Sequence, residues 1–361
     1  MNPALLIDCA IITIFIIYLL SMINKQTILQ IRNVYTANAF HDGRAFYVGA
    51  GSETEPDVRL YDMIGQTEQS LDDCPGGMMG FIPIPGIPGT LVSIMGLFPP
   101  FIGKDTGIFM HVEGEDGWKT ERAMDLPFAH RCEFITSGDE IFLVAATVSR
   151  HKEDPGDWSQ KGEVHLIPFR EPQADSWESS VISSSVTRNH GMVRALAGGK
   201  ETVCVSGAEG IFAISPAGHG SWEFTRLFDR EVSEMTFIDL DGDGVPELVT
   251  VEPFHGDSLN IYKNREDGWE LRYSDSLSFG HGLSSGMYNG RPVIAVGNRD
   301  ASLALEIFTI DNLGKGIVNR RIIEENAGPT QTQVFTFAGM DYILSANQKK
   351  HEVALYSGSF Y

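Results

Sequence analysis

The chain is poor in cysteine. Its four cysteines lie far apart and include no Cys-x-x-Cys pair: Cys9, Cys74, Cys132 and Cys204. Closely spaced cysteines mark zinc knuckles and redox sites, and small secreted domains need many cysteines to build a disulfide framework. The sequence therefore predicts neither kind of structure, and the four thiols fit reduced or buried side chains.

Positive charge is also scarce. The chain has 27 Lys and Arg residues against 48 Asp and Glu residues, which gives a formal net charge of -21. A field of this sign repels phosphate backbones and anionic membrane surfaces. We therefore expect no nucleic-acid partner, although a local basic patch could still bind an acidic small molecule.

Two further absences concern catalytic motifs and linkers. The chain has no Gly-x-Ser-x-Gly elbow, P-loop, His-Glu-x-x-His pair or dinucleotide fingerprint. It also has no Pro/Gly/Ser-rich linker among its 361 residues, so one large repetitive domain is expected. The 38 glycines are typical of turns between many short strands rather than of long helices, and they favour an all-β fold.

The amino terminus is unusually apolar. Residues 10–23 carry no charge, and extension back to Ala4 adds only Asp8, which gives about the ~20 residues that span a bilayer. The direct interpretation is a single-pass anchor and a membrane-bound protein. Alternatives are a start-site artefact, with a cytoplasmic chain that begins at Met22, or a cleaved signal peptide, although no Lys or Arg precedes the run. We therefore divide the chain into an apolar segment, 1–24, and a folded domain, 25–361.

An apolar strand pattern recurs seven times in the folded domain. The copies begin 45 to 61 residues apart, at Ala45, Thr90, Glu140, Glu201, Pro246, Arg291 and Met340. Each is followed by a polar loop and further strands, and this period is typical of a four-stranded propeller blade. The sequence therefore predicts a seven-bladed β-propeller of four-stranded blades. The last unit ends after its third strand, so residues 26–34 are expected to supply the missing strand and close the ring.

One hairpin of the repeat carries an acidic loop. Asp239, Asp241 and Asp243 alternate with Leu and Gly between two apolar strands, and Glu247 is placed to close the far side. Such carboxylates can direct several oxygens at one hard cation. The stretch Phe237–Leu248 resembles the loop of FG-GAP/VCBS-type propellers. That resemblance implies a structural Ca²⁺ in a loop that joins the first and second strands of a blade. It covers one blade of the seven, because the other hairpins lack the acidic spacing.

Polar side chains from distant parts of the chain should meet at one rim of the propeller. The loops that enter the inner strands and the loops between the second and third strands share that rim. We expect the first set at 38–41, 74–77, 128–131, 188–191, 232–234, 279–282 and 329–331, with His130, His190, His281 and Arg131 as candidate catalytic residues. The second set contributes Glu53, Lys104, His255, Arg299 and Asn347 as candidate ligand-binding residues. The long insertion at 149–162, which contains Trp158, is expected to form a lid, a wall or a solvated loop.

Three chemistries suit such a rim. The histidines could hold a second divalent metal with an open coordination position. They could instead act as general base or acid, with Arg131, Lys104 or Arg299 binding a carboxylate or stabilising an enolate. Binding of a sugar without turnover is the third option.

The predicted function is a carbohydrate-active lyase or dehydratase that abstracts a proton next to a carbonyl or carboxylate. Its partner would be a small molecule or oligosaccharide. The chain resembles seven-bladed polysaccharide lyases and sugar dehydratases in one respect only, which is the predicted histidine-lined pocket. The alternative is a non-catalytic binding or adhesion module, which much of the FG-GAP/VCBS group resembles. Adhesion-type relatives usually carry several acidic loops, and the single loop here favours the enzyme.

Overall fold

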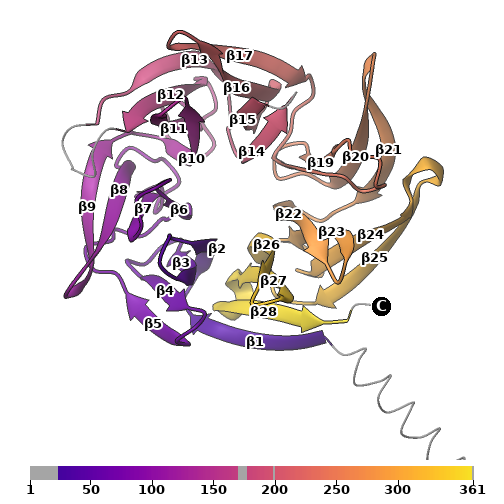
Figure 1. Cartoon of the computed structure of the whole chain (residues 1–361), viewed down its shortest axis with the longest axis horizontal. Helices are drawn as coiled ribbons and strands as arrows, with labels where there is room; N and C mark the ends of the chain where they lie inside the picture. The colour runs from indigo at the N-terminus through magenta and orange to yellow at the C-terminus, as the bar shows by residue number, and fades with distance from the viewer. Residues whose placement is uncertain (1–22, 170–176, 198–199, 360–361) are drawn as a thin grey trace, which may run out of the picture.

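The protein is a seven-bladed β-propeller. A computed structural model describes residues 23–169, 177–197 and 200–359, and its seven antiparallel sheets of four strands stand around one axis (Figure 1). Blades 1 to 6 are β2–β5, β6–β9, β10–β13, β14–β17, β18–β21 and β22–β25, and blade 7 joins β26–β28 to β1. The predicted fold, blade number and strand number are confirmed.

The inner two strands of the blades have the following bounds. The inner strands, which face the axis, are β2 (Val34–His41), β6 (Phe81–Pro83), β10 (Ala129–Ser137), β14 (Met192–Ala197), β18 (Glu234–Ile238), β22 (Gly280–Tyr288) and β26 (Pro329–Phe337). The second strands are β3 (Phe46–Ser52), β7 (Thr90–Met95), β11 (Glu140–Thr147), β15 (Lys200–Gly207), β19 (Glu247–Glu252), β23 (Arg291–Asn298) and β27 (Met340–Asn347). These second strands are the apolar segments that recur in the sequence.

The outer two strands complete each blade. The third strands are β4 (Val58–Asp62), β8 (Gly107–Gly114), β12 (Gly162–Phe169), β16 (Gly210–Gly218), β20 (Ser258–Arg265), β24 (Leu305–Asn312) and β28 (Glu352–Gly358). The outer strands are β5 (Thr67–Ser70), β9 (Gly117–Asp125), β13 (Ser180–Val186), β17 (Ser221–Phe228), β21 (Gly268–Ser276), β25 (Ile317–Glu324) and β1 (Ile23–Gln30). Two short 3₁₀ turns follow β24 and β27: Leu313–Lys315 and Gln348–Lys350.

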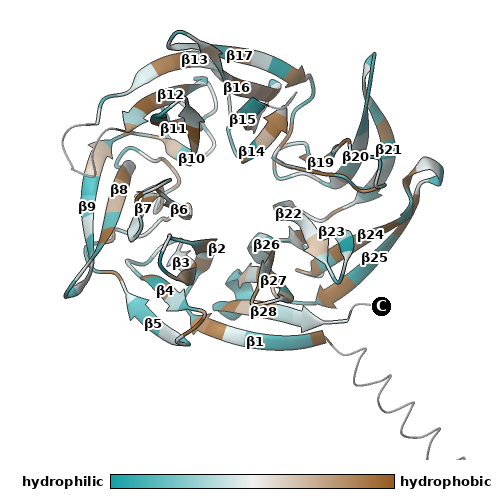
Figure 2. Ribbon diagram, in the orientation of Figure 1, coloured by the Kyte–Doolittle hydropathy of each residue, from teal (hydrophilic) through white to brown (hydrophobic). Residues whose placement is uncertain are grey.

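Burial explains why the second strands stand out in the sequence. Every residue of β7 and β19 is buried, because each sheet is covered on both faces by its neighbouring blades. The outer strands alternate instead between exposed and half-buried side chains, as along β17, and Figure 2 shows this mixture of polar and apolar residues. The strongest apolar signal therefore belongs to the strands that lie between two blades.

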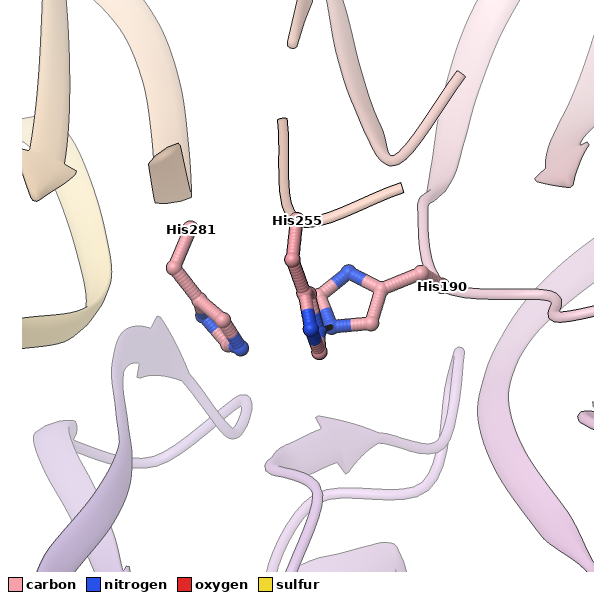
Figure 3. Close-up of side chains that lie close together, drawn as sticks. All are labelled: His190, His255 and His281. Atoms are coloured by element: carbon pink, nitrogen blue, oxygen red, sulfur yellow. Dashed lines mark hydrogen bonds between the residues drawn. The ribbon is translucent and has the colours of Figure 1, made fainter. Parts of the chain in front are cut away.

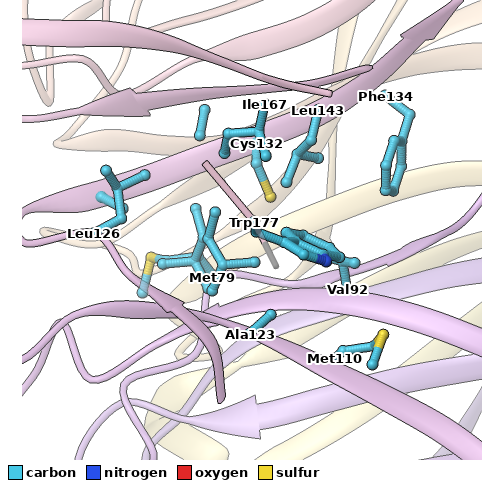
Figure 4. Close-up of a cluster of buried hydrophobic side chains, with 14 of the residues drawn as sticks. Met79, Val92, Met110, Ala123, Leu126, Cys132, Phe134, Leu143, Ile167 and Trp177 are labelled. Carbon is cyan, nitrogen blue, oxygen red and sulfur yellow. The ribbon is translucent and has the colours of Figure 1, made fainter. Parts of the chain in front are cut away.

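The core consists of clusters packed between adjacent blades. Between blades 2 and 3, Met79, Val92 and Met110 contact Leu143 and Trp177, all of them at least nine-tenths buried (Figure 4). Comparable clusters fill the other interfaces, and one of them joins blade 1 to blade 7. Cys74, Cys132 and Cys204 are free and buried, as the sequence predicts.

The amino-terminal strand closes the ring. β1 pairs antiparallel with β28, from Ile23 opposite Gly358 to Gln30 opposite Glu352. Lys25 forms salt bridges with Glu324, at 2.7 Å, and with Glu352. The predicted closing strand is confirmed, although it begins and ends a few residues earlier than expected.

The predicted anchor segment falls largely on residues 1–22, which lie outside the described residues. Within the described part of the chain, none of the helices is long and apolar enough to cross a membrane.

Candidate functional site

Three histidines from three blades converge at one end of the axis. His190 precedes β14, His255 lies in the loop between β19 and β20, and His281 belongs to β22 (Figure 3). One ligand nitrogen from each lies within 4.8 Å of the other two, and the ring centroids are 4.7 to 5.2 Å apart. These three side chains, which we name the rim histidines, are close enough to share one cation.

A repeated backbone device delivers ring side chains to this point. A residue with positive φ lies two positions before the ring at the entrance to four blades: Asn33 before Tyr35, Phe128 before His130, Arg188 before His190 and Phe279 before His281. In blades 1, 3 and 6 the inner strand then contains a β-bulge at the ring residue or beside it. Bulges at a rim redirect side chains, and here they direct them toward the axis.

Hydrogen bonds fix the protonation of two rim histidines. Nδ1 of His281 lies 2.6 Å from the carbonyl oxygen of Thr330, which can only accept, so Nδ1 carries the proton and Nε2 keeps its lone pair. Nδ1 of His190 lies 2.7 Å from Oε1 of Glu234, so the Nε2 atom of His190 is likewise unprotonated. Metal-binding histidines show this arrangement, with the remote nitrogen held by a carboxylate or carbonyl.

The third rim histidine completes the group. Nε2 of His255 lies 3.1 Å from Nε2 of His190, and since the latter is an acceptor, His255 donates. A bound metal would take the place of this bridging proton. His255 is half-buried and stacks on Phe254 at 4.0 Å between ring centroids, so the site opens toward solvent at this side chain.

Burial keeps these imidazoles neutral. His190 and His281 expose 2% and 1% of their surface, and desolvation lowers the pKa of both below the ordinary range. Desolvation, with smaller contributions from His190 and Arg299, lowers the pKa of His255 to about 2. Neutral imidazole is the form that binds metals. The cluster is therefore prepared for a metal at neutral pH without loss of protons from charged rings.

His130 and Arg131 flank the rim histidines. The ring of His130 lies 4.9 Å from that of His190, and among the described residues its buried Nδ1 has no hydrogen-bond partner. Burial, reinforced by Arg131 and the neighbouring histidines, places the pKa of His130 well below its usual value. Arg131 donates from Nε to the carbonyl oxygen of His190, at 2.7 Å, and from Nη2 to Glu234, at 3.0 Å.

Tyr35 and Glu234 are site residues that the sequence analysis missed. The hydroxyl of Tyr35 lies 3.2 Å from Nε2 of His281, and burial raises the pKa of this phenol to about 12. The expected entry loop of the first blade, 38–41, is wrong, because these residues lie inside β2 and the rim position is held by Tyr35. No sequence signal marks this position, because the bulges that align Tyr35 with His130 and His281 are visible only in the structure.

Arg299 lies near the rim histidines, since its charge contributes to lowering the pKa of all three. It donates to Gln348 at 2.7 Å, and Gln348 donates to Glu53 at 2.8 Å. The guanidinium also lies over the rings of Tyr35 and Phe279, at 5.7 and 5.5 Å. Glu53 and Arg299 are thus connected beside the rim histidines, and their binding of a ligand stays a prediction.

Two other expected ligand-binding residues lie elsewhere. Lys104 is exposed on the loop between β7 and β8, where its charge acts on Glu153. Asn347 is fully buried inside blade 7, and its amide donates to Glu352 at 3.0 Å and to Tyr356 at 2.8 Å. Neither side chain is part of the cluster.

The insertion between β11 and β12 forms a wall beside the cluster. Lys152 is fully buried there, with Nζ 3.4 Å from the ring centroid of Trp158 and 4.6 Å from that of Phe101. Burial lowers the pKa of this ammonium to about 8. Trp158 in turn contacts Phe254 at 5.6 Å, which links the insertion to His255. Of the three expected roles for this segment, the contacts favour the wall.

The acidic loop lies at the other end of blade 5, between β18 and β19. Asp239, Asp241 and Glu247 bring one carboxylate oxygen each within 4.8 Å of one another, and Asp243 lies beside them. The side chain of Lys263 also reaches these carboxylates. Calcium at this loop stays a prediction.

Comparisons with solved structures find other propellers. The chain is similar to the β-propeller domain of Myceliophteria thermophila Cps50 (Swd1), with a TM-score of 0.57 and 11% identity over 93% of this chain and 100% of that one. It is also similar to Saccharomyces cerevisiae Sqt1, with a TM-score of 0.53 and 10% identity over 90% and 84% of the two chains. Chaetomium thermophilum Raptor gives a TM-score of 0.55 and 13% identity, over 93% of this chain and 29% of Raptor.

At these identities the likeness shows the propeller fold alone. No protein-family model matches the chain, and none of the curated proteins is similar to it in sequence. The membership of the FG-GAP/VCBS group that the acidic loop suggests is therefore not shown.

Proposed function

We propose that the rim histidines hold a divalent transition metal and that the protein is a metal-dependent lyase or dehydratase acting on a sugar with a carbonyl or carboxylate. The observation that carries the proposal is that one ligand nitrogen from each of His190, His255 and His281 lies within 4.8 Å of the other two, with Nε2 of His190 and of His281 unprotonated. Imidazole ligands suit Zn, Fe, Ni or Cu rather than Ca²⁺ or Mg²⁺. Three protein ligands leave a position open for substrate, as catalytic sites require.

The neighbouring side chains supply what proton abstraction needs. A metal at the rim would polarise the carbonyl or carboxylate of the substrate. In this proposal His130 takes the adjacent proton, which is supported by its neutral form and by an Nδ1 atom without a hydrogen-bond partner among the described residues. A double bond then forms as the C–O bond on the next carbon breaks. The phenol of Tyr35 stays protonated up to high pH and can give its proton to the leaving oxygen.

Charge and shape favour an anionic ring as substrate. Arg299 and Arg131 lie beside the rim histidines, and both lower the pKa of His190 through their charge. Phe254 and Trp158 are half-buried and offer aromatic faces to a sugar ring next to His255. These groups support a uronate-containing oligosaccharide as the substrate, with its carboxylate bound by arginine and its rings by the aromatic faces.

A non-catalytic binding module of the FG-GAP/VCBS kind is the second candidate. The observation that favours it is the near-complete burial of His190 and His281, since structural metal sites are closed. In that case the metal would only join blades 4, 5 and 6, and ligands would bind elsewhere on the propeller.

The test is metal content and turnover in the same variants. We expect the wild type to bind about one Zn²⁺ or Fe²⁺ per chain, measured by mass spectrometry after dialysis, and to form unsaturated product from a uronate panel, followed by absorbance. Each of His190→Gln, His255→Gln and His281→Gln should lose the metal, with affinity reduced at least ~100-fold, and the turnover. His219→Gln, which changes an exposed histidine in the turn between β16 and β17, is the matched control.

The possible outcomes separate the two candidates. If the three variants lose the metal but the wild type turns over no substrate, the result favours the binding module. Unchanged metal content in all three rim variants would overturn the site itself.

A further inference from the structure

The acidic loop is held by its own backbone. The two oxygens of Asp239 accept hydrogen bonds from the amides of Gly242, at 2.7 Å, and Gly244, at 2.8 Å. Both glycines have positive φ, 78° and 84°, which the tight turn requires. Oε2 of Glu247 accepts from the amide of Leu240 at 2.7 Å. These hydrogen bonds hold the loop in its turn without an ion. They also occupy carboxylate oxygens of Asp239 and Glu247 that could otherwise bind a cation.

A lysine from the adjacent strand occupies the centre of the loop. Leu248 of β19 pairs with Tyr262 of β20, so Lys263 follows beside Glu247. Its Nζ atom lies 2.5 Å from Oδ2 of Asp241, 2.8 Å from Oδ2 of Asp243 and 2.9 Å from Oε1 of Glu247. An ammonium has three hydrogens, and here each has a carboxylate oxygen as its acceptor.

Two members of the ion cluster are removed from water, whereas the side chains of Asp241 and Asp243 expose 28% and 46% of their surface. The side chain of Glu247 is fully buried and that of Lys263 exposes 9% of its surface. A buried charge is costly unless it is paired, and loss of one partner leaves the other uncompensated. Expulsion of the ammonium without a replacement cation would therefore leave the buried carboxylate of Glu247 uncompensated.

We infer that the ammonium of Lys263 is the resident cation of the acidic loop, so that the hairpin is closed by the chain itself and needs no calcium. Ca²⁺ requires six to eight oxygens at about 2.3–2.6 Å, and it would have to compete with Lys263 for the same three carboxylates. The lysine also fastens the third strand of blade 5, β20, to the turn that joins its first two strands. Removal of the lysine charge should uncover a divalent-cation site.

The inference is tested with CaCl₂ alone as the probe, on the full chain, by thermal unfolding with and without EDTA. We expect the Tm of the wild type to be unchanged by EDTA and by calcium up to about 10 mM, which exceeds the ~1 mM Kd of weak calcium modules. In EDTA, Lys263→Met should melt at least ~3 °C lower, because three carboxylates then repel one another. Calcium should restore this loss in a concentration-dependent way.

Lys119→Met is the matched control, since it removes the same charge from an exposed position on β9. We expect its Tm to be the same in EDTA and in calcium. If Lys263→Met does not fold, its combination with Asp243→Asn, which removes one repelling carboxylate, takes its place. The inference is overturned if calcium raises the Tm of the wild type but not that of Asp241→Asn, because calcium would then be the native ion. If calcium does not raise the Tm of the Lys263 variants, the prediction that loss of the lysine charge uncovers a divalent-cation site is overturned.

Discussion

At the scale of single residues, the rim depends on backbone conformations that a chain adopts only when its surroundings require them. Phe128 and Phe279 have φ values of 64° and 56°, which are unusual for bulky residues. Each precedes a buried histidine by two positions, His130 and His281. Such outliers persist where the fold overdetermines them, and they gather at functional sites.

The buried histidines should make stability fall in mild acid. In the folded state the pKa of His255 is lowered to about 2, and those of His130, His190 and His281 are also lowered, whereas in the unfolded chain each is near ~6.5. Below pH ~6.5 the unfolded state therefore binds more protons than the folded state, and stability falls as the pH falls. Each such histidine contributes about 1.4 kcal/mol per pH unit. Urea unfolding between pH 7.5 and 5.5, in EDTA so that no metal competes, measures this slope.

A variant identifies the source of that slope. His255→Gln should reduce the pH dependence by about one proton, whereas His219→Gln, which changes an exposed histidine, should leave it as in the wild type. Equal slopes in the wild type and His255→Gln would show that the imidazole of His255 is not held neutral by burial.

At the scale of elements, the starts of the inner strands decide how closely neighbouring blades approach. A Cβ atom on Gly282 of β22 would lie 2.6 Å from Cα of Gln331 in β26. Both residues lie at the bulged starts of their strands, next to His281 and Thr330. The absence of a side chain at Gly282 thus lets the carbonyl of Thr330 reach His281.

Gly282→Ala should therefore damage both stability and the site. Because the clash is with backbone, β26 must move, and overpacking of this kind costs about 1–3 kcal/mol. We expect a lower urea midpoint with an unchanged m-value, together with weaker metal binding at the rim. Gly114→Ala is the control, since the nearest atom to its added Cβ is 3.5 Å away. If Gly282→Ala binds metal like the wild type, this glycine is not needed to position His281 for the metal.

At the scale of the whole molecule, ring closure joins the two ends of the chain. β1 covers the edge of β28 that would otherwise be an open template for pairing, and Lys25 links it to two carboxylates. The same closure brings Tyr35 of blade 1 to His281 of blade 6. The contact between Tyr35 and His281 in the site therefore depends on closure of the ring.

Removal of the closing strand should open the propeller. A chain that begins at Met22 keeps β1, and we expect it to be monodisperse with a sharp thermal transition. A chain that begins at Asn33 lacks β1, and we expect it to aggregate through the edge of β28, as size-exclusion chromatography and thermal unfolding would show. Equal Tm values for the two chains would contradict this role of β1.

The sequence predicted the parts of the structure that local pattern encodes. The second strands are buried on both faces, so their apolar runs repeat visibly and gave the blade number, the strand number and the closing strand. The inner-strand starts carry no such period, because their conformation depends on bulges and on the next blade. For that reason the first entry loop was placed at 38–41, and Tyr35 was missed.

The candidate site shows the same division. The sequence alone determined that histidines would stand at the entrances of blades and that carboxylates would alternate in one hairpin, because residue type and spacing are properties of the chain. Only the tertiary structure decided that His190, His255 and His281 face one another, that Glu234 and Thr330 orient two of them, and that Lys263 lies among the carboxylates. The physical reason is that these contacts, apart from those within blade 5, join different blades, so their distances are set by how the blades pack around the axis.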